Sequence, residues 1–251
     1  MTLTADEVRA RLLTLREHDL PTHGGRTLAY VDDSGRPDVD AVAREAVAAF
    51  AGTNGLDPSV FPAVATMERG VVDFLAGLLS APEGYAGTVT SGGTESNNLA
   101  LRGTGPHATH PVAVTSSVEH PATAQPLALM EADGWTVHRL PVDTNGRIHA
   151  DAVPEGPIGL GTLILAQNET GTSLPVAQFA ERVHAAGGVI HTDAAQAVGK
   201  INVQVDELGV DLSRLPARLR RIEEVDLARH AEDVRRDRER VEPDVFGVSC
   251  Q

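Results

Sequence analysis

The sequence is poor in several residue types, and each shortage limits what the protein can do. Lys200 is the only lysine among 21 basic residues, so a reaction that needs a side-chain amine has one candidate. Cys250 is the only cysteine, which excludes an internal disulfide framework and a zinc site made of cysteines. Aromatic residues make up 3% of the chain, so we expect a core built mainly of Ala, Val and Leu.

Long apolar runs are also missing. No stretch approaches the roughly 20 apolar residues that a membrane helix needs. The first residues lack the basic region and apolar stretch of a secretory signal. These absences predict a cytoplasmic protein without a membrane partner.

The negative charge is concentrated in the first 213 residues. They carry 12 basic and 26 acidic groups, whereas residues 214–251 carry nine of each, so the formal charge of −14 lies before this tail. An acidic surface repels phosphate backbones and anionic lipids. We therefore expect no nucleic-acid partner, although the backbone amides of a helix N-terminus could still bind a small anion.

The spacing of apolar residues divides the chain into three segments. Residues 1–62 are expected to form a helical N-terminal segment, residues 63–213 an α/β domain, and residues 214–251 a charged, helical tail. In the middle segment short strands alternate with helices, which predicts a mostly parallel sheet covered on both faces. The expected strands are 87–90, 112–116, 135–140, 162–166 and 188–192, and the expected helices are 4–18, 38–51, 63–80, 93–102, 121–132 and 176–186.

Two glycines between an expected strand and an expected helix form the strongest local signal. Gly92 and Gly93 let the backbone approach an anion closely, and the helix that follows presents free amides. Ser91 and Thr94 add hydroxyl donors, so the arrangement suits a phosphate monoester. An ordinary turn that caps a helix explains the same residues equally well.

Three further polar residues follow the ends of other expected strands. His120 follows the second strand, Asn168 the fourth and Asp193 the fifth, at the edge where ligands bind in open α/β sheets. An imidazole there could stack on a flat ring or move protons, and a carboxylate could hold a protonated pyridine nitrogen or a metal ion. Taken singly, each residue has a structural explanation as a helix cap, a surface residue or part of an Asx-turn. Their joint placement favours a ligand site.

The segments around these residues resemble the aminotransferase class V family, and most of all the cysteine desulfurases. The likeness covers residues 87–209 and rests on TSGGTESNNLAL, SSVEHPA, DGWTVHRLPVDTNGRI, LAQNETGTSLPV and GGVIHTDAAQAVGKINVQVDELGVDL. It implies the large domain of a fold type I pyridoxal-phosphate enzyme, usually dimeric, that takes sulfur from L-cysteine and leaves alanine. We therefore expect pyridoxal 5'-phosphate as the cofactor, an amino acid as the substrate and no metal ion.

The resemblance also implies a role for each matching residue. Gly93 and Thr94 would bind the cofactor phosphate, and His120 would stack on the pyridine ring. Asn168 would lie near the substrate and the ring hydroxyl. Asp193 would pair with the pyridine nitrogen and keep it protonated, which makes the ring an electron sink.

One element of the family pattern is absent. The family's lysine that bonds to the cofactor lies in a Ser-x-His-Lys segment soon after the ELGVD-like segment, but here Ser213 is followed by Arg-Leu-Pro. Lys200 matches the lysine of the family's AVGK segment instead. The resemblance implies that Gln196, a few residues earlier, would hydrogen-bond the phenolic oxygen of the cofactor. We interpret Lys200 as solvent-facing on the next helix, with a covalent role as the alternative. Cys250 is interpreted as incidental, with a reactive terminal thiol as the alternative. We expect a truncated domain with impaired catalysis, from a shortened gene product or a change of reading frame near residue 213.

Two other interpretations stay open. THGGRTLAYVDDSG, TNGLDPSVFPAV and MERGVVDFLAGLL resemble the pyridoxal-phosphate decarboxylases and carbon–carbon lyases related to sphingosine-phosphate lyase. These enzymes share the fold and the cofactor. The chain could also be a non-catalytic fragment or a partner-binding subunit. Because fold type I sites form at dimer interfaces, we expect a homodimer or a mixed dimer with a full-length relative.

Overall fold

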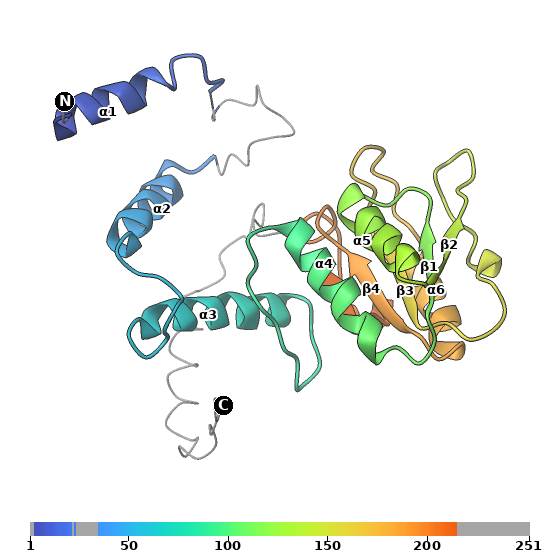
Figure 1. Cartoon of the computed structure of the whole chain (residues 1–251). Helices are drawn as coiled ribbons and strands as arrows, with labels where there is room; N and C mark the ends of the chain where they lie inside the picture. Colours follow the sequence, from blue (N-terminus) through green and yellow to red (C-terminus); the bar gives the residue numbers. More distant parts are fainter. Residues whose placement is uncertain (1–2, 22, 24–34, 215–251) are drawn as a thin grey trace. The chain divides into compact units, whose positions relative to one another are not determined.

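The structure is a computed structural model, and it describes residues 3–21, 23 and 35–214. The chain divides into two units, Met1–Thr53 and Asn54–Gln251 (Figure 1). The tail beyond residue 214 and Cys250 lie outside the described residues, and the expected division at residues 62 and 213 stays a prediction. Across the described ranges, no helix combines the length and the apolar character needed to cross a bilayer.

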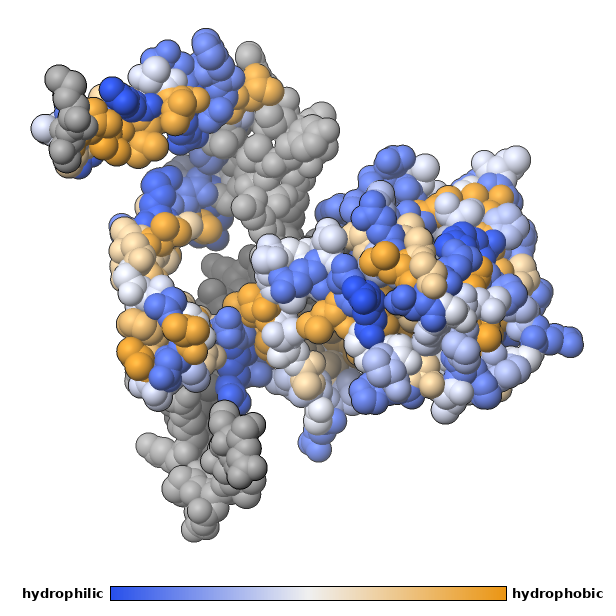
Figure 2. All heavy atoms as spheres, viewed as in Figure 1, coloured by the Kyte–Doolittle hydropathy of each residue, from blue (hydrophilic) through white to orange (hydrophobic). Residues whose placement is uncertain are grey.

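The first unit contains two helices, α1 (Ala5–Thr14) and α2 (Pro37–Phe50). Thr4 and Glu7 form a capping box, because the Thr4 hydroxyl accepts from Glu7 N–H at 3.3 Å and the Glu7 carboxylate accepts from Thr4 N–H at 2.7 Å. Pro37 is the first residue of α2, where its missing N–H costs no helix hydrogen bond. Neither helix buries a residue, and Leu12 and Leu13 of α1 are exposed. Figure 2 shows apolar atoms along this helix.

The second unit begins with α3 (Pro62–Leu78) and continues into an α/β domain. Its five strands are β1 (Val112–Ser116), β2 (Thr136–Leu140), β3 (Leu160–Ile164), β4 (Val189–Asp193) and β5 (Leu212–Arg214). They form one sheet in the order β2-β1-β3-β4-β5, and every neighbouring pair is parallel. The remaining helices are α4 (Gly93–Thr104), η1 (Gly105–His107), α5 (Pro121–Ala132), η2 (Ala150–Ala152), α6 (Val176–Ala185) and α7 (Val205–Leu208).

Helices cover both faces of this sheet, as the alternation of strands and helices predicts (Figure 1). On one face Leu101 of α4 and Leu127 of α5 pack together over β1 and β3. On the other face Phe179 and Val183 of α6 join the larger core cluster. Gly161 of β3 allows α6 to approach closely, because a Cβ at that position would lie 2.8 Å from Val183 Cγ2. The α/β class and the parallel sheet are therefore confirmed.

Some sequence expectations about the strands are wrong. Residues 87–90 form no strand, since they do not pair with any strand of the sheet. Gly87 lies instead against α3, where a Cβ would meet Val72 Cγ1 at 2.7 Å. The fourth expected strand begins at Leu160 rather than at residue 162, because Leu160 pairs in register with both neighbouring strands. The sequence also does not predict β5, a short strand that acquires its form by pairing with β4.

Candidate functional site

The carboxyl ends of β1, β3 and β4 meet at one edge of the sheet. β1 lies between β2 and β3, so the chain leaves β1 to one side and returns to its other side. This is a topological switch point, the place where open α/β sheets bind ligands. His120 and Asn168 follow β1 and β3, and Asp193 ends β4, so the structure brings all three to this edge.

The turn at Gly92 and Gly93 leads directly into α4. Gly92 is the N-cap residue, and no side chain caps the helix. The amides of the first turn, which includes Gly93 and Thr94, therefore point out of the helix end, where the helix dipole favours an anion. The Ser91 hydroxyl and N–H both donate to the Glu95 carboxylate, at 2.6 and 2.7 Å, and these hydrogen bonds lower the pKa of Glu95.

Asp193 is almost fully buried, with 2% of its surface exposed. Its Oδ2 accepts a hydrogen bond from Asn97 Nδ2 at 2.9 Å, and its Oδ1 accepts from Ala195 N–H at 3.1 Å. Asn97 lies one turn into α4 and is fully buried. The same Nδ2 donates to Thr123 Oγ1 of α5 at 2.9 Å. The end of β4 is thus tied to α4 and, through Asn97, to α5.

Glu119 occupies the switch point itself. Its Oε1 accepts from Ser116 Oγ at 2.6 Å and from Ile164 N–H at 3.0 Å, so one carboxyl oxygen connects the ends of β1 and β3. Its Oε2 is buried without a hydrogen-bond partner among the described residues. Burial raises the pKa of Glu119 to about 7, against the two hydrogen bonds, and the negative charge of Asp193 adds to the rise.

His120 and Asn168 are exposed at the same edge. His120 is the N-cap residue of α5, where its Nδ1 accepts from Ala122 N–H at 3.1 Å, so its role as a helix cap is confirmed. Asn168 lies in the turn after β3. The side chain of Gln167 holds this turn, because its Oε1 accepts from the two backbone N–H groups that follow Asn168.

Gln196 and Lys200 contact each other on the surface after β4. Lys200 Nζ donates to Gln196 Oε1 at 2.5 Å, and both residues are exposed. The helix expected to carry Lys200 is wrong, since residues 195–200 form successive turns. Gly199 has a φ of 77°, in the left-handed region, which a right-handed helix cannot accommodate.

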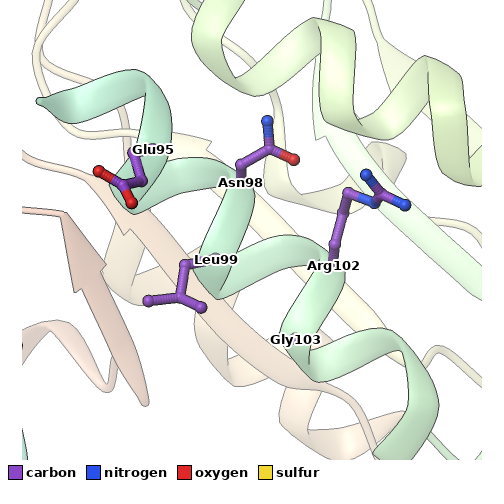
Figure 3. A pocket seen from close by; sticks show the side chains of 5 residues that line it. All are labelled: Glu95, Asn98, Leu99, Arg102 and Gly103. Carbon is purple, nitrogen blue, oxygen red and sulfur yellow. The ribbon is translucent and has the colours of Figure 1, made fainter. Parts of the chain in front are cut away.

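A shallow hollow lies elsewhere, along the outer face of α4 (Figure 3). Figure 3 shows the residues that line it: Glu95, Asn98, Leu99, Arg102 and Gly103. Their spacing of three and four residues places them on one side of α4, and the buried Asn97 lies on the other side. The hollow is therefore separate from the sheet edge that carries the predicted site residues.

Comparison with known proteins identifies the family. The model of the aminotransferase class V family matches residues 67–218, more than half of the chain. The chain belongs to this family. A cysteine desulfurase of Sinorhizobium fredii is 36% identical over 200 residues, which cover 75% of this chain and 51% of the relative. A cysteine desulfurase of Azospirillum brasilense is 43% identical over 129 residues, which cover 49% of this chain and 32% of the relative.

Solved structures agree with this family. The crystal structure of DndA from Streptomyces lividans is similar with a TM-score of 0.55 and 29% identity, over 73% of this chain and 53% of that chain. The chain thus spans about half of the length of the Sinorhizobium relative and about a third of the Azospirillum one. The names of these relatives favour the cysteine desulfurases over the decarboxylases and lyases.

Class V aminotransferases and cysteine desulfurases depend on pyridoxal 5'-phosphate, and the residues at this edge fit that cofactor. The helix N-terminus at Gly93 suits a phosphate dianion. The buried carboxylate of Asp193 suits a protonated ring nitrogen. Asn97, one turn after Gly93 in α4, connects the two groups through its hydrogen bond to Asp193. The roles of the individual residues stay predictions.

Two residues of this arrangement receive no role from the sequence alone. Asn97 and Glu119 both lie inside quoted family segments, but attention there falls on the glycines and on His120. A signal for Asn97 is its position four residues before Leu101, which places a polar side chain on the apolar face of α4. For Glu119 no comparable signal exists, because its burial arises from the pairing of β1 with β3.

Proposed function

We propose that this chain binds pyridoxal 5'-phosphate at the carboxyl edge of its sheet in the manner of a cysteine desulfurase, with an amino acid of the L-cysteine type as substrate. The hydrogen bond between Asn97 Nδ2 and Asp193 Oδ2 carries this proposal. It joins an uncapped helix N-terminus to a buried carboxylate, the two groups that the phosphate and the pyridine nitrogen require. When bound, the cofactor supplies an electron sink for the substrate's Cα.

In this proposal Asp193 keeps the ring nitrogen protonated. Hydrogen bonds from Asn97 Nδ2 and Ala195 N–H favour the ionised form of the carboxyl group, because both donate to its oxygens. A buried carboxylate beside a pyridine nitrogen then favours the positively charged ring, since the attraction is little screened by water.

The remaining contacts orient the cofactor. Amides of Gly93 and Thr94 bind the phosphate, and the imidazole of His120, fixed by its cap hydrogen bond, lies against the ring. Gln196 offers the phenolic oxygen its Nε2, because its Oε1 already accepts from Lys200. Asn168, in the exposed turn after β3, contacts the substrate side of the ring.

Catalysis by these 251 residues alone is proposed to be impaired. Lys200 is the only lysine, and the sequence contains no Ser-x-His-Lys segment. Its exposed Nζ is held by Gln196. Without a lysine amine above the ring, the cofactor is bound without a covalent bond, and no such amine moves the proton at the substrate's Cα.

The test is a titration of the protein with pyridoxal 5'-phosphate, followed by the shift of the cofactor's visible absorbance. We expect saturable binding that Asp193→Ala weakens at least tenfold, since this variant removes the buried charge opposite the ring nitrogen. Asp133→Ala is the matched control, because Asp133 is an exposed carboxylate that precedes β2 at the opposite edge of the sheet.

Borohydride reduction with mass mapping addresses the covalent step. We expect no pyridoxyl adduct on Lys200. An adduct there would overturn the noncovalent part of the proposal. Absence of saturable binding, or equal binding by the Asp193→Ala and Asp133→Ala proteins, would reject the cofactor site. Alanine and sulfide released from L-cysteine at the rate of a full-length relative would contradict the proposed impairment.

We also propose that the chain associates with a second copy or with a full-length relative. The exposed apolar side chains of α3 support this, since Met67, Val71 and Leu78 lie 37–50% exposed. Light scattering after size exclusion, at two concentrations and with an added full-length cysteine desulfurase, measures the association. A monomer that never exchanges with the relative contradicts it.

A further inference from the structure

The Asn97 side chain is placed where an apolar residue would pack more easily. It is fully buried on the face of α4 that also carries Leu101, and its Oδ1 has no hydrogen-bond partner among the described residues. An unpaired buried acceptor is unfavourable, so the donors of the same amide must contribute enough to offset it. Both bonds that they make, to Thr123 and to Asp193, cross between elements.

The two acceptors fix which way the Asn97 amide faces. When the carboxyl group of Asp193 is ionised, its Oδ2 carries no proton and can act only as a hydrogen-bond acceptor. The –NH₂ group of Asn97 must therefore point at it. Turning the amide over would place Oδ1 against the carboxylate, which is repulsive. Thr123 Oγ1 holds the same –NH₂ group from the side of α5. The amide is therefore a fixed donor aimed at one oxygen of Asp193.

From this geometry we propose that Asn97 is a positioning residue that keeps Asp193 ionised and aimed into the cofactor site. The inference rests on the proposed function and deepens it. Because Asn97 lies one turn after Gly93, it also fixes the distance between the phosphate end and the carboxylate end of the site. Nothing in the role of Asn97 requires contact with the substrate or the cofactor.

The other charged groups around Asp193 show why such a donor is needed. Glu119, from the connection between β1 and α5, contributes a repulsive interaction with Asp193. His191 lies two residues earlier on the same face of β4, and its Nδ1 is hydrogen-bonded to Thr162 at 2.8 Å. A negative charge on Glu119 repels one on Asp193, whereas the donors Asn97 Nδ2 and Ala195 N–H stabilise the charge on its carboxylate.

The experiment measures the pKa of Asp193 directly, by carboxyl ¹³C NMR of aspartate-labelled protein without cofactor, with the signal assigned through Asp193→Asn. We expect Asn97→Ala to raise this pKa by about one to two units, the size of a lost hydrogen bond to a charged group. In Asn97→Asp, a substitution of equal size, two adjacent carboxyl groups share a proton and titrate in two steps, one of them well above the wild-type value. Thr123→Val keeps the amide but frees its orientation, so we expect a smaller rise.

Leu101→Ala is the matched control. It removes buried volume from the same face of α4, one turn later, and lowers the melting temperature without touching Asp193. A residue that only packs would make Asn97→Ala behave like Leu101→Ala, with lower stability and an unchanged Asp193 titration, and that outcome overturns the proposal. If Asn97→Ala does not fold, the titrations of Asn97→Asp and Thr123→Val replace it. An Asp193 titration unchanged from the wild type in both variants overturns the proposal.

A second measurement separates this inference from the proposed function. The pH titration of the absorbance of bound pyridoxal 5'-phosphate is expected to shift in Asn97→Ala and to stay in place in Leu101→Ala. A raised Asp193 pKa in a protein that binds no cofactor supports the role of Asn97 and rejects the proposed function. If the cofactor binds but Asp193 titrates identically in all variants, the result supports the proposed function and rejects the role of Asn97.

Discussion

Glu119→Gln is expected to make the protein more stable at high pH and to leave its stability at low pH nearly unchanged. In the folded protein, burial raises the pKa of Glu119 from 4.5 to about 7, while the unfolded chain retains the ordinary value. The glutamine side chain has the shape of the protonated form. Its amide oxygen can still accept from Ser116 Oγ and Ile164 N–H, as Glu119 Oε1 does.

The magnitude follows from the two pKa values. Below pH 4.5 the carboxyl group is protonated in both states, so its contribution to stability is fully present. Between pH 4.5 and about 7 the unfolded chain releases the proton and the folded protein keeps it, so the wild-type free energy of unfolding falls with rising pH. The separation of about 2.5 units, at about 1.4 kcal/mol per unit, corresponds to a loss of about 3 kcal/mol that levels off above pH 7.

The assay is urea unfolding at half-unit steps from pH 5 to pH 8, followed by far-UV circular dichroism and by the fluorescence of Trp135, the only tryptophan. The quantity of interest is the difference in the free energy of unfolding between the variant and the wild type. In this difference the contributions of titratable groups common to both proteins cancel. We expect this difference to grow by about 2 to 3 kcal/mol toward pH 8.

Glu131→Gln serves as the control for this experiment. Glu131 is an exposed carboxylate that pairs with Arg139 at 2.9 Å, and this hydrogen bond lowers its pKa. Its titration therefore lies below the range of the assay, and the difference should be flat from pH 5 to pH 8. A flat difference for Glu119→Gln as well, or one that shrinks with pH, would refute the argument that Glu119 is protonated near neutrality.

Four other substitutions test the packing of the domain, its surface and the role of its lysine. Gly161→Ala should lower the free energy of unfolding by about 1–3 kcal/mol, since the new Cβ would lie 2.6 Å from Ile190 Cδ1. Gly103→Ala, in open space within α4, should raise it by about 0.5–1 kcal/mol, and equal effects of the two in urea unfolding would contradict the packing argument. Phe179→Ala should cost about 3–5 kcal/mol, because this side chain of α6 is fully buried against the sheet, and a loss under 1 kcal/mol would mean that the core is not packed as described. Lys200→Met should lower the affinity for pyridoxal 5'-phosphate only slightly in an absorbance titration, since it removes one exposed hydrogen bond that orients Gln196, and a loss of about tenfold or more would show that the amine itself takes part in binding.

The sequence predicts the sheet well where strands are buried on both sides. The strand 112–116 and the helix 121–132 agree with β1 and α5, because their apolar runs are bounded by clear turn residues. Residues 87–90 have the same β-branched composition, yet a strand also needs a hydrogen-bonded neighbour, which no local pattern reveals. β5 is a strand that the local pattern does not indicate, since its three residues show almost no alternation. They form a strand because they pair with the neighbouring β4.

The site could be located from the sequence but not its internal connections. Polar residues after successive strands predict a common edge, and His120 and Asp193 lie there. The local signals could not show that Asp193 is held by Asn97, because the bond depends on how α4 lies across the sheet. They also could not show the burial of Glu119, whose two partners come from different strands.

The bond between Asn97 and Asp193 also has a consequence for the order of folding. It closes a loop of 96 residues, whereas the bond between Asn97 and Thr123 closes one of 26, and the longer closure costs about 1 kcal/mol more in chain entropy. The pair of α4 and α5 can therefore form early, while Asp193 arrives only after β4 has joined the sheet. Substitutions at Asp193 should accordingly speed unfolding and leave the folding rate almost unchanged, which makes the site the last part to assemble and the first to open.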